Sequence, residues 1–491
     1  MELVHEQCYR AVRSRDVRFD GRFYTGVRTT GIYCRPVCPA PAPKPENIDF
    51  YPSAAAAEEA GFRPCKRCRP DSLPGTPAWN GTSATVTRAL RLIAGGALDD
   101  GGIEELAGRL GVGDRQLRRL FLQHVGASPV AVNRSRRAHF AKTLLEQTSL
   151  RVTEIAFAAG YASVRSFNDH FKRVFRATPS EVRVRESGGA MGGARGEKSR
   201  GATEPLALRL TCRDPIDWPH LAGYFETRRV PGVETVTNGA YHRVITADDK
   251  TNILTVRMAK DGVRIELDRP GGRDLMKVCN RVRNQFDLDA NPKRVEEVLA
   301  EDPFLAESVA AHPGMRVPGA YDPFELILRA IVGQQISVKG TTTILGRIVE
   351  AHGEPLDPGL ARDGLTHKAP TPETLAGANL DGLGMNGAKV RTIQAAARAV
   401  ADGAIPLDGS ASFEELDAAL LAVPGIGPWT AGYVAMRAFR NPDAFLPTDL
   451  GVKHALADIV PSKRRTEIEA RAERWRPWRA YALLHLWRSP A

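Results

Sequence analysis

LLAVPGIGPWTAGYVAMRAF, residues 420–439, is the stretch that decides the fold of the C-terminal part of the chain. Apolar residues at helical spacing lie on both sides of the tetrapeptide PGIG, which predicts two helices joined by a tight hairpin, the second beginning at about Trp429. Gly425 and Gly427 let backbone amides approach a phosphate at a helix N-terminus. Asp449 follows twenty residues after Trp429. Taken alone, the hairpin is a common turn, and a helix N-cap is the alternative role for Asp449.

The surroundings of the hairpin make the interpretation more specific. PFELILRAIVGQQIS at 323–337, the hairpin itself, FLPTDLGVKH around Asp449, and AERWRPWRAYALLHLW at 472–487 occur in this order. Over about residues 205–488 the sequence resembles the AlkA-type 3-methyladenine DNA glycosylases of the helix-hairpin-helix superfamily. The resemblance implies DNA binding by the two hairpin glycines and a monovalent cation at the hairpin.

The resemblance also assigns site residues. It implies that Asp449 is the catalytic carboxylate, and that Trp429, Tyr433 and Trp487 form an aromatic pocket for the base. Gln335 falls where the family inserts an apolar wedge into the DNA base stack, and glutamine departs from that pattern. From the sequence alone, the alternative is that the three aromatic residues belong to an ordinary hydrophobic core.

These residue types suit the excision of a base. Cleaving an N-glycosidic bond builds an oxocarbenium-like sugar, which a carboxylate stabilises while directing water. Aromatic faces hold a base that has left its stack, and they attract cationic N3- or N7-alkylated purines more than normal bases. Bifunctional relatives carry a lysine where this chain has Trp429, and Cys279 is the last cysteine. Neither a Schiff-base amine nor an iron–sulfur cluster is therefore expected.

Upstream of the helical part the hydrophobic pattern changes. LALRL, ILTVRM and VRIELD, within residues 205–270, alternate apolar and polar residues, which predicts half-buried strands. Helical spacing returns around 274–287 and dominates from 322 onward. These patterns predict an α+β antiparallel-sheet domain at 205–315, followed by an all-α helix-hairpin-helix glycosylase domain at 316–491.

The N-terminal part contains two close cysteine pairs, Cys34 with Cys38 and Cys65 with Cys68, separated by 26 residues. Two thiol pairs brought together by the fold make a tetrahedral all-sulfur site that suits one zinc ion. The chain has seven cysteines in 491 residues and no secretion signal, so a disulfide framework is not expected. Most four-cysteine zinc sites only hold a small domain together, and that alternative stays open at this point.

The sequence around these cysteines contains TTGIYCRP and GFRPCKRC in order. Over roughly residues 5–72 it resembles the N-terminal zinc domain of Ada-type alkylation-response proteins. The resemblance implies that Cys34 accepts a methyl group from a methylphosphotriester in DNA. Zinc keeps a bound thiol deprotonated, so a sulfur nucleophile is present at neutral pH. Methylation removes one negative charge from the site, which predicts tighter binding to DNA phosphates.

Residues 86–186 show helical spacing and contain an internal repeat. LAGRLGV at 106–112 and IAFAAGY at 155–161 are each followed by a second apolar helix, and Gly111 and Gly160 suggest closely approaching helices. The repeat resembles the two helix-turn-helix units of AraC-type regulators, in an all-α DNA-binding domain. The candidate recognition residues are Arg115, Arg118, Arg119, Arg165, Asn168, Lys172 and Arg173. A plain helical bundle with solvated basic faces is the alternative.

The charge distribution favours DNA as the partner of this first part. The net charge is +11, and residues 1–186 hold 29 Lys and Arg against 19 Asp and Glu. A basic domain points to a polyanion, although charge alone equally suits a soluble surface. There is no apolar run of about 18 residues and no signal sequence, so no membrane partner and a cytoplasmic, nucleoid-associated location are expected.

Together these patterns predict a multidomain protein. The order begins with a small α+β zinc domain at 1–72 and the helix-turn-helix domain at 86–186. A Gly-rich linker at 187–204 and the two glycosylase domains follow. Residues 71–85 are also predicted to be a linker. The predicted function is DNA alkylation repair by hydrolytic excision of alkylated bases, combined with methyl transfer to Cys34 and sequence-specific binding of double-stranded DNA. The alternative is primarily a methylation-switched transcription activator with weak glycosylase activity, for which RNA polymerase is a further partner.

Overall fold

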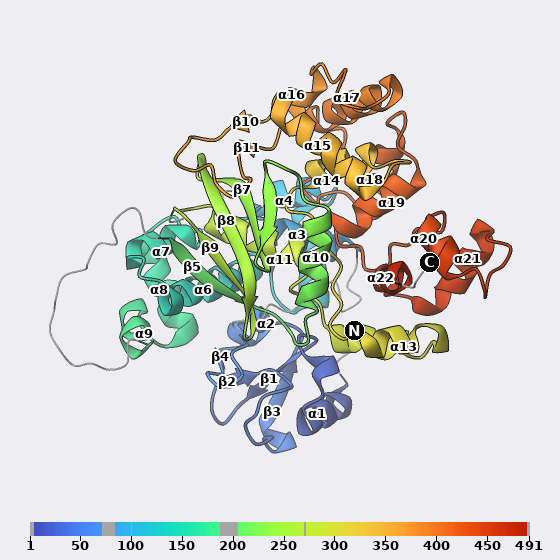
Figure 1. The fold of residues 1–491 in the computed structure, drawn as a ribbon. Coiled ribbons are helices and arrows are strands. Elements are labelled where there is room, and N and C mark those ends of the chain that lie inside the picture. The colour runs from blue at the N-terminus through green and yellow to red at the C-terminus, as the bar shows by residue number, and fades with distance from the viewer. Residues whose placement is uncertain (1–3, 71–83, 100, 187–204, 270–271, 489–491) are drawn as a thin grey trace. The chain divides into compact units, whose positions relative to one another are not determined.

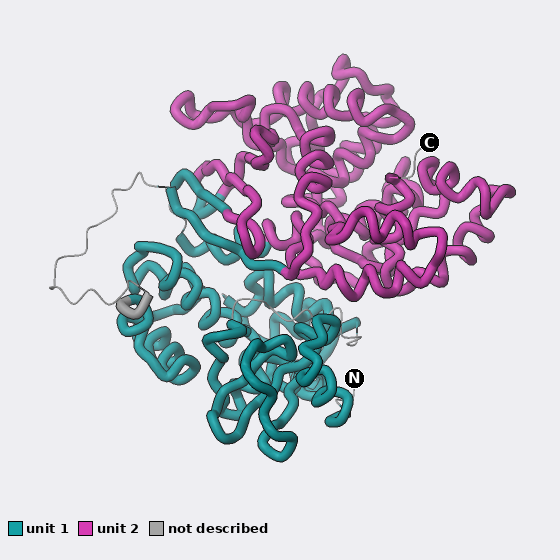
Figure 2. Tube along the Cα trace, turned by 60° about the horizontal axis from the view of Figure 1, so that its bottom comes forward, with its two compact units in different colours: residues 1–212, 247–249, 265–280 teal, residues 213–246, 250–264, 281–491 magenta. Residues whose placement is uncertain are grey.

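The computed structural model describes residues 4–70, 84–99, 101–186, 205–269 and 272–488. Most of the turn-rich segment at 71–85 and the whole predicted linker at 187–204 therefore lie outside the described residues. The chain forms two compact units, which Figure 2 distinguishes by colour. Unit 1 comprises Met1–Cys212, Ala247–Asp249 and Ile265–Asn280, and unit 2 comprises Arg213–Thr246, Lys250–Arg264 and Arg281–Ala491.

The first seventy residues form a small α+β module (Figure 1). Its helical elements are α1 (His5–Ser14), η1 (Val17–Phe19), η2 (Pro45–Asn47) and α2 (Ala54–Glu59). Its strands are β1 (Tyr24–Val27), β2 (Ile32–Cys34), β3 (Ile48–Tyr51) and β4 (Arg63–Pro64), in the sheet order β3-β1-β2-β4. Strands β2 and β4 pair in parallel, with Tyr33 opposite Pro64. This register brings the next residue on each chain segment, Cys34 and Cys65, side by side.

The described residues from 84 to 186 are helical, as predicted. The helices are α3 (Ala84–Ala94), α4 (Ile103–Arg109), α5 (Asp114–Val125), α6 (Pro129–Gln147), α7 (Val152–Ala158), α8 (Val164–Phe175) and α9 (Pro179–Glu186). The two predicted repeats are α4–α5 and α7–α8, with α6 between them. Gly111 and Gly160 follow the first helix of each pair with φ of +69° and +76°. At Gly111 the left-handed backbone requires glycine, and not a close helix approach, because an added Cβ would meet nothing within 4 Å.

The predicted strands are also present. Strands β5 (Leu206–Thr211), β6 (Glu234–Thr237), β7 (Ala240–Ala247), β8 (Lys250–Ala259) and β9 (Gly262–Leu267) form a sheet in the order β5-β9-β8-β7-β6, in which β6 and β7 are antiparallel. The burial of β5 alternates strictly along the strand, as its apolar–polar pattern predicts. The helices of this part are α10 (Trp218–Thr227), α11 (Leu275–Gln285), α12 (Pro292–Leu299) and α13 (Pro303–Ala311).

A helical domain follows, built around α14 (Pro323–Val332), which packs against its neighbours α15, α17 and α19. Its other elements are α15 (Val338–His352), α16 (Pro372–Ala376), α17 (Gly387–Ala401), α18 (Phe413–Leu421), α19 (Pro428–Arg437), α20 (Leu450–Ala455), α21 (Arg465–Ala472), η4 (Glu473–Trp475) and α22 (Arg479–Arg488). A short antiparallel pair, β10 (Glu354–Pro355) with β11 (His367–Lys368), interrupts the otherwise helical pattern. Helix α19, the second helix of the predicted hairpin, packs against α14 in this domain.

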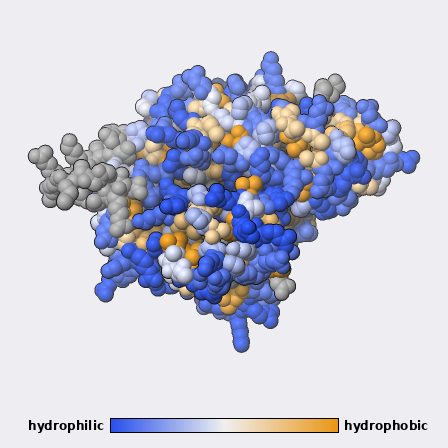
Figure 3. Space-filling view, turned by 90° about the horizontal axis from the view of Figure 1, so that it is seen from below, coloured by the Kyte–Doolittle hydropathy of each residue, from blue (hydrophilic) through white to orange (hydrophobic). Residues whose placement is uncertain are grey.

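The surface carries few large apolar side chains. On the face seen in Figure 3, hydrophilic residues predominate and hydrophobic residues form small separate areas. Among the described helices, none is long and apolar enough to cross a membrane. Some large hydrophobic residues do stand exposed, such as Leu450 at 70% exposure, which is normal for a protein surface.

Candidate functional sites

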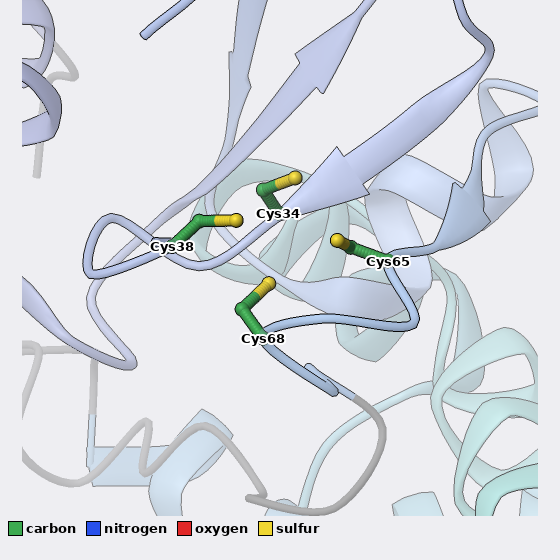
Figure 4. Close-up of side chains that lie close together, drawn as sticks. All are labelled: Cys34, Cys38, Cys65 and Cys68. Carbon is green, nitrogen blue, oxygen red and sulfur yellow. The ribbon is translucent and has the colours of Figure 1, made fainter. Parts of the chain in front are cut away.

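Figure 4 shows four side chains that point toward a common centre: Cys34, Cys38, Cys65 and Cys68. Their sulfur atoms all lie within 4.8 Å of one another. Four thiolates at about 2.3 Å from a tetrahedral zinc would be about 3.8 Å apart, so the donor set and its size fit zinc. Turns position the second member of each pair: the Cys38 N–H donates to the Arg35 carbonyl (3.1 Å), and the Arg69 N–H donates to the Cys65 carbonyl (3.0 Å).

The four sulfur atoms are not equivalent. Cys38, Cys65 and Cys68 are buried, with 7–9% of their surface exposed, whereas Cys34 is partly exposed. The backbone N–H of Arg35 donates to the Cys68 sulfur (3.4 Å), and Cys38 accepts from the backbone of Ala40. Such N–H donors withdraw charge from a thiolate. Cys34 is therefore the most exposed of the four residues and, like Cys65, accepts no backbone N–H among the described contacts.

The close thiols oppose one another's ionisation. The hydrogen bond from Cys34 stabilises the Cys38 thiolate and so lowers the pKa of Cys38. The same hydrogen bond keeps the proton on Cys34 and so raises the pKa of Cys34. A dication at the centre removes this opposition, since it balances the charge of several thiolates at once. The cluster is thus chemically suited to a bound metal ion.

The residue before Cys34 connects the zinc module to the helix-turn-helix module within unit 1. The Tyr33 hydroxyl donates to Glu58 on α2 (2.8 Å), and the same carboxylate contacts His139 Nε2 on α6 (2.6 Å). Arg69, which follows the last cysteine, forms an ion pair with Glu146, also on α6. Helix α6 therefore contacts both ends of the cysteine cluster through neighbouring residues.

The predicted recognition residues all stand on α5 or α8 and are exposed: Arg115, Arg118, Arg119, Arg165, Asn168, Lys172 and Arg173. The opposite faces of these helices are apolar and buried, with Leu117 and Phe121 on α5 and Phe167 and Phe171 on α8. Arg118 lies 3.7 Å from Asp114 in an exposed ion pair, which contributes little stability. The exposed basic faces are free to meet a phosphate or a base edge.

In unit 2, Asp449 is the N-cap of α20, and its Oδ1 accepts from the Val452 N–H (3.2 Å). The N-cap interpretation is therefore correct, but it is not the whole role of this carboxylate. The indole Nε1 of Trp429 donates to Oδ2 (2.9 Å), and the indole Nε1 of Trp487 donates to Oδ1 (2.9 Å). Two aromatic side chains from other helices thus fix the orientation of the carboxylate.

Tyr433 lies one helical turn after Trp429 and stacks on it, with ring centroids 5.1 Å apart and an angle of 12° between the rings. Its hydroxyl contacts the Tyr224 hydroxyl (3.1 Å) and accepts from Arg437 (2.5 Å). Burial raises the pKa of Tyr224 to about 12. Burial acts in the same direction on Tyr433, but Arg437 and the hydrogen bond from Tyr224 lower its pKa. At 7% exposure, Tyr433 is mainly a support for Trp429.

These side chains line a cavity of about 1200 Å³. The three predicted aromatic residues and Asp449 all contribute to its wall, as do Tyr224 and Arg228 of α10. The Arg228 guanidinium lies 4.1 Å from the Tyr224 ring centroid. A cavity of this size admits a nucleobase together with part of its sugar. Sequence reasoning missed Tyr224 and Arg228, because nothing in the spacing of α10 distinguishes them from an ordinary helix.

The hairpin has the predicted shape, with α18 ending at Leu421 and α19 beginning at Pro428. Gly425 has φ of +93°, and a Cβ there would lie 2.1 Å from Thr392 Oγ1 on α17, so both backbone and packing require glycine. A Cβ at Gly427, the N-cap of α19, would meet nothing within 4 Å. The open space in front of Gly427 is what a close approach by a phosphate needs.

The loop that follows α14 reaches the mouth of the same cavity. Gln335 is exposed and has φ of +59°, in the left-handed region. The cavity is lined at this point by Ile336 and Val338. The residue at the predicted wedge position, Gln335, is therefore polar and exposed. The apolar residues Ile336 and Val338 follow it in the sequence.

Comparison with known protein families covers all four modules. Residues 7–71 match the metal binding domain of Ada, and residues 106–185 match a helix-turn-helix domain. Residues 207–322 match the AlkA N-terminal domain, and residues 328–480 match the HhH-GPD superfamily of base excision DNA repair proteins. The four predicted kinds of domain are thus present in the predicted order, while their boundaries stay predictions.

Individual relatives extend this result. A probable bifunctional transcriptional activator/DNA repair enzyme AlkA of Mycobacterium tuberculosis is 42% identical, over 98% of this chain and 96% of its own. DNA-3-methyladenine glycosylase 2 of Escherichia coli is 33% identical, over 57% of this chain and 95% of its own. A solved 3-methyladenine DNA-glycosylase from Archaeoglobus fulgidus has the same fold over 57% of this chain and 97% of its own, with a TM-score of 0.50 at 22% identity. Because the first relative matches along nearly its whole length, the chain belongs to the family of bifunctional AlkA-type transcriptional activator/DNA repair enzymes.

Proposed function

We propose that residues 205–491 act as a DNA glycosylase that removes alkylated bases of the 3-methyladenine type by hydrolysis. The observation that carries this proposal is the carboxylate of Asp449, held by two indole N–H groups in the wall of a cavity that admits a nucleobase. A carboxylate whose orientation is fixed before the reaction stabilises positive charge that develops on the sugar without rearranging.

The chemistry follows from the contacts. The bond between sugar C1′ and the base nitrogen breaks, the electron pair leaves with the base, and positive charge spreads over the sugar ring. Oδ1 of Asp449 already accepts two N–H groups, whereas Oδ2 accepts one, so Oδ2 has the freer lone pair for a water or for the sugar. The indole faces of Trp429 and Trp487 hold an extruded cationic purine beside this carboxylate.

The mode of cleavage is also part of this proposal. Trp429 occupies the position of the lysine in bifunctional relatives, and no lysine lines the part of the cavity that the structure describes. The protein is therefore a monofunctional enzyme that leaves an abasic site in an intact strand. The decisive assay incubates alkylated duplex DNA with the intact chain, with and without borohydride. Release of a free alkylated base and an alkali-labile abasic site supports the proposal. A trapped covalent complex or direct strand scission would overturn it.

For the first unit we propose a second activity, transfer of one methyl group from a DNA methylphosphotriester to Cys34. The sulfur–methyl bond forms while the methyl–oxygen bond breaks, and the phosphodiester anion leaves. The supporting observation is that Cys34 is the most exposed of the four cysteines and lacks the backbone donors that Cys38 and Cys68 have among the described contacts. The thioether does not revert, so each molecule reacts once. Peptide mass mapping after exposure to such DNA tests the assignment, which is wrong if the methyl maps to Cys38, Cys65 or Cys68.

We further propose that methylation of Cys34 strengthens promoter binding and so activates transcription of alkylation-response genes, with RNA polymerase as a later partner. The loss of one thiolate charge near the exposed basic faces of α5 and α8 reduces repulsion from DNA phosphates. Unit 1 contains both the cysteine cluster and these helices. The affinity of the methylated and unmethylated protein for one promoter, measured over a range of salt, tests this step, and equal affinity at every salt concentration would refute it. The expected nucleoid location also belongs to this proposal.

The alternative, an activator with weak glycosylase activity, differs in one measurable respect. It predicts tight promoter binding by the methylated protein but little release of alkylated base. The oriented carboxylate in unit 2 favours an active glycosylase. Capping a helix requires only the contact with a backbone N–H, whereas the two indole donors in addition fix the orientation of the Asp449 carboxylate. A single-turnover rate of base release decides between the two.

A further inference from the structure

Helix α10 lines the large cavity of unit 2 with a row of three side chains. His220, Tyr224 and Arg228 are spaced by four residues, so they stand on one face of the helix, and all three belong to the cavity wall. The Tyr224 hydroxyl contacts the hydroxyl of Tyr433, whose ring stacks on Trp429. This face of α10 therefore adjoins the aromatic wall that, on the proposed function, holds the extruded base.

The first residue of this row is held at both its backbone and its ring. The His220 N–H donates to Asp217, the N-cap of α10 (3.0 Å). Arg488, at the end of α22, donates from its guanidinium to His220 Nδ1 (2.7 Å). The residue before it, Trp487, donates to Asp449. The imidazole is thus positioned by the same helix end that orients the carboxylate.

The contact with Arg488 determines which nitrogen of the imidazole carries the proton. A guanidinium donates hydrogen bonds and does not accept them, so Nδ1 is the accepting nitrogen and the proton of the neutral ring is on Nε2. Burial lowers the pKa of His220, and the charge of Arg488 lowers it further. The ring is therefore neutral near pH 7 and presents one N–H donor, at Nε2.

This Nε2 atom has no hydrogen-bond partner within the described part of the chain, although it is buried. Other buried side-chain atoms also lack a partner, but His220 is the only one of these residues, among those that the structure describes, that lines the cavity. A buried N–H without an acceptor costs free energy. A ligand that brings an acceptor into the cavity therefore gains affinity by pairing with it.

We propose that His220 is a specificity-determining residue whose Nε2–H donates a hydrogen bond to an acceptor atom of the extruded base. This inference rests on the proposed glycosylase function and adds to it a second criterion beside charge. The aromatic faces select a base by its cationic ring, whereas a neutral N–H selects it by a ring nitrogen or a carbonyl oxygen. A base without an acceptor at this position leaves the N–H unpaired and is released more slowly.

The test uses the intact chain and three duplexes that differ in one base. The first duplex carries 7-methylguanine, which keeps N3 and O6 as acceptors. The second carries the 3-deaza analogue, in which C–H replaces N3, and the third carries the 6-deoxo analogue, in which hydrogen replaces O6. Each single-turnover rate of base release is divided by the spontaneous depurination rate of the same duplex, which removes differences in leaving-group ability.

The wild-type protein should release 7-methylguanine faster than one of the two analogues by roughly 5- to 20-fold, which corresponds to one hydrogen bond. In His220→Phe, which keeps an aromatic ring but has no donor, this preference should fall below about 2-fold. His220→Gln should keep part of the preference, because its amide N–H also donates. The matched control is Glu226→Gln on the exposed face of α10, which should behave as the wild type. Thermal unfolding checks that each variant is folded.

Three results overturn the proposal. The first is equal release of all three bases by the wild-type protein, because neither acceptor then matters. The second is a preference that survives unchanged in His220→Phe. The third is an equal loss on all three duplexes in His220→Phe, which means that His220 only supports the cavity wall. If the wild-type protein releases no alkylated base from any duplex, the proposed function itself fails, which distinguishes the two failures.

Discussion

The two candidate sites of this molecule are built in opposite ways. The four cysteines come from a stretch of 35 residues, between Cys34 and Cys68, and two short turns and one pair of strands bring them together. The Asp449 site collects side chains that are 20 and 38 residues away in sequence, and Tyr224 from a different domain. A local metal site can form from spacing alone, whereas an oriented carboxylate requires the packing of several helices. The two sites should therefore respond differently to the same perturbations.

Removal of zinc should produce the largest difference between the two sites. The small α+β module has only a few hydrophobic clusters of three or four buried residues, so the metal should supply most of its stability, typically about 10 kcal/mol or more for structural zinc. With a chelator we expect the amides of residues 5–70 to exchange freely, measured by hydrogen-exchange mass spectrometry. The amides of α14 to α22 should stay protected, because a large cluster of buried hydrophobic side chains holds these helices together. Protection that survives in the N-terminal module would show that its apolar packing suffices.

Asp449→Asn should produce the next largest effect. Loss of the negative charge removes the stabilisation of the sugar cation, which costs on the order of 100- to 1000-fold in the rate of base release. The asparagine NH2 also faces one of the two indole N–H donors, so one of these contacts is lost as well. DNA binding should persist, since the hairpin amides are unchanged. The matched change in the other site, Cys34→Ser, should abolish methyl uptake and leave base release at the wild-type rate. Near-normal excision by Asp449→Asn would falsify the assignment.

The stability of unit 2 should depend on pH through His485. Burial lowers the pKa of this histidine from 6.5 to about 4, and its Nδ1 contacts Ser308 Oγ (2.9 Å). The unfolded chain binds a proton near pH 6.5, whereas the folded chain does so only near pH 4. The stability from this residue is therefore fully present above about pH 6.5 and is lost as pH falls toward 4, by at most about 3 kcal/mol.

Tryptophan fluorescence reports mainly on unit 2, because five of the six tryptophans lie in that unit and the sixth, Trp79, lies outside the described residues. Urea unfolding at pH 7 and at pH 5 should give a lower midpoint at pH 5. His485→Gln should flatten this dependence, because glutamine does not take up a proton. An unchanged pH dependence in His485→Gln would assign the effect to other groups.

Trp487→Phe should give the smallest of these effects. The substitution keeps an aromatic ring and removes the indole N–H that donates to Asp449 Oδ1. A hydrogen bond to a charged acceptor contributes about 1.5–3 kcal/mol, so base release should slow by roughly 10- to 100-fold, less than for Asp449→Asn. Single-turnover rates with saturating enzyme separate this loss from weaker binding. A loss as large as that of Asp449→Asn would mean that orientation by the indole matters as much as the charge.

Several features of the molecule could be predicted from the sequence. The cysteine spacing predicted the four-sulfur cluster, and the apolar periods predicted the helical repeat and the alternating strands, because these patterns depend on neighbours in the chain. The close-approach explanation of Gly111 was wrong, since the residue is needed for its left-handed backbone and not for packing. Spacing alone does not distinguish these two reasons for a glycine.

By itself, the sequence predicted the order of the modules, the four cysteines that cluster in the structure, and the position of Asp449 after its hairpin. Only the tertiary structure decided what surrounds that carboxylate. The two indole donors, the Tyr224–Tyr433–Arg437 network and the position of Ile336 at the cavity rim all arise between segments that are distant in sequence. The physical reason is that a ligand set on adjacent turns is fixed by local backbone geometry. A shared cavity wall, in contrast, depends on how whole helices pack, and that packing cannot be predicted from the sequence of any single segment.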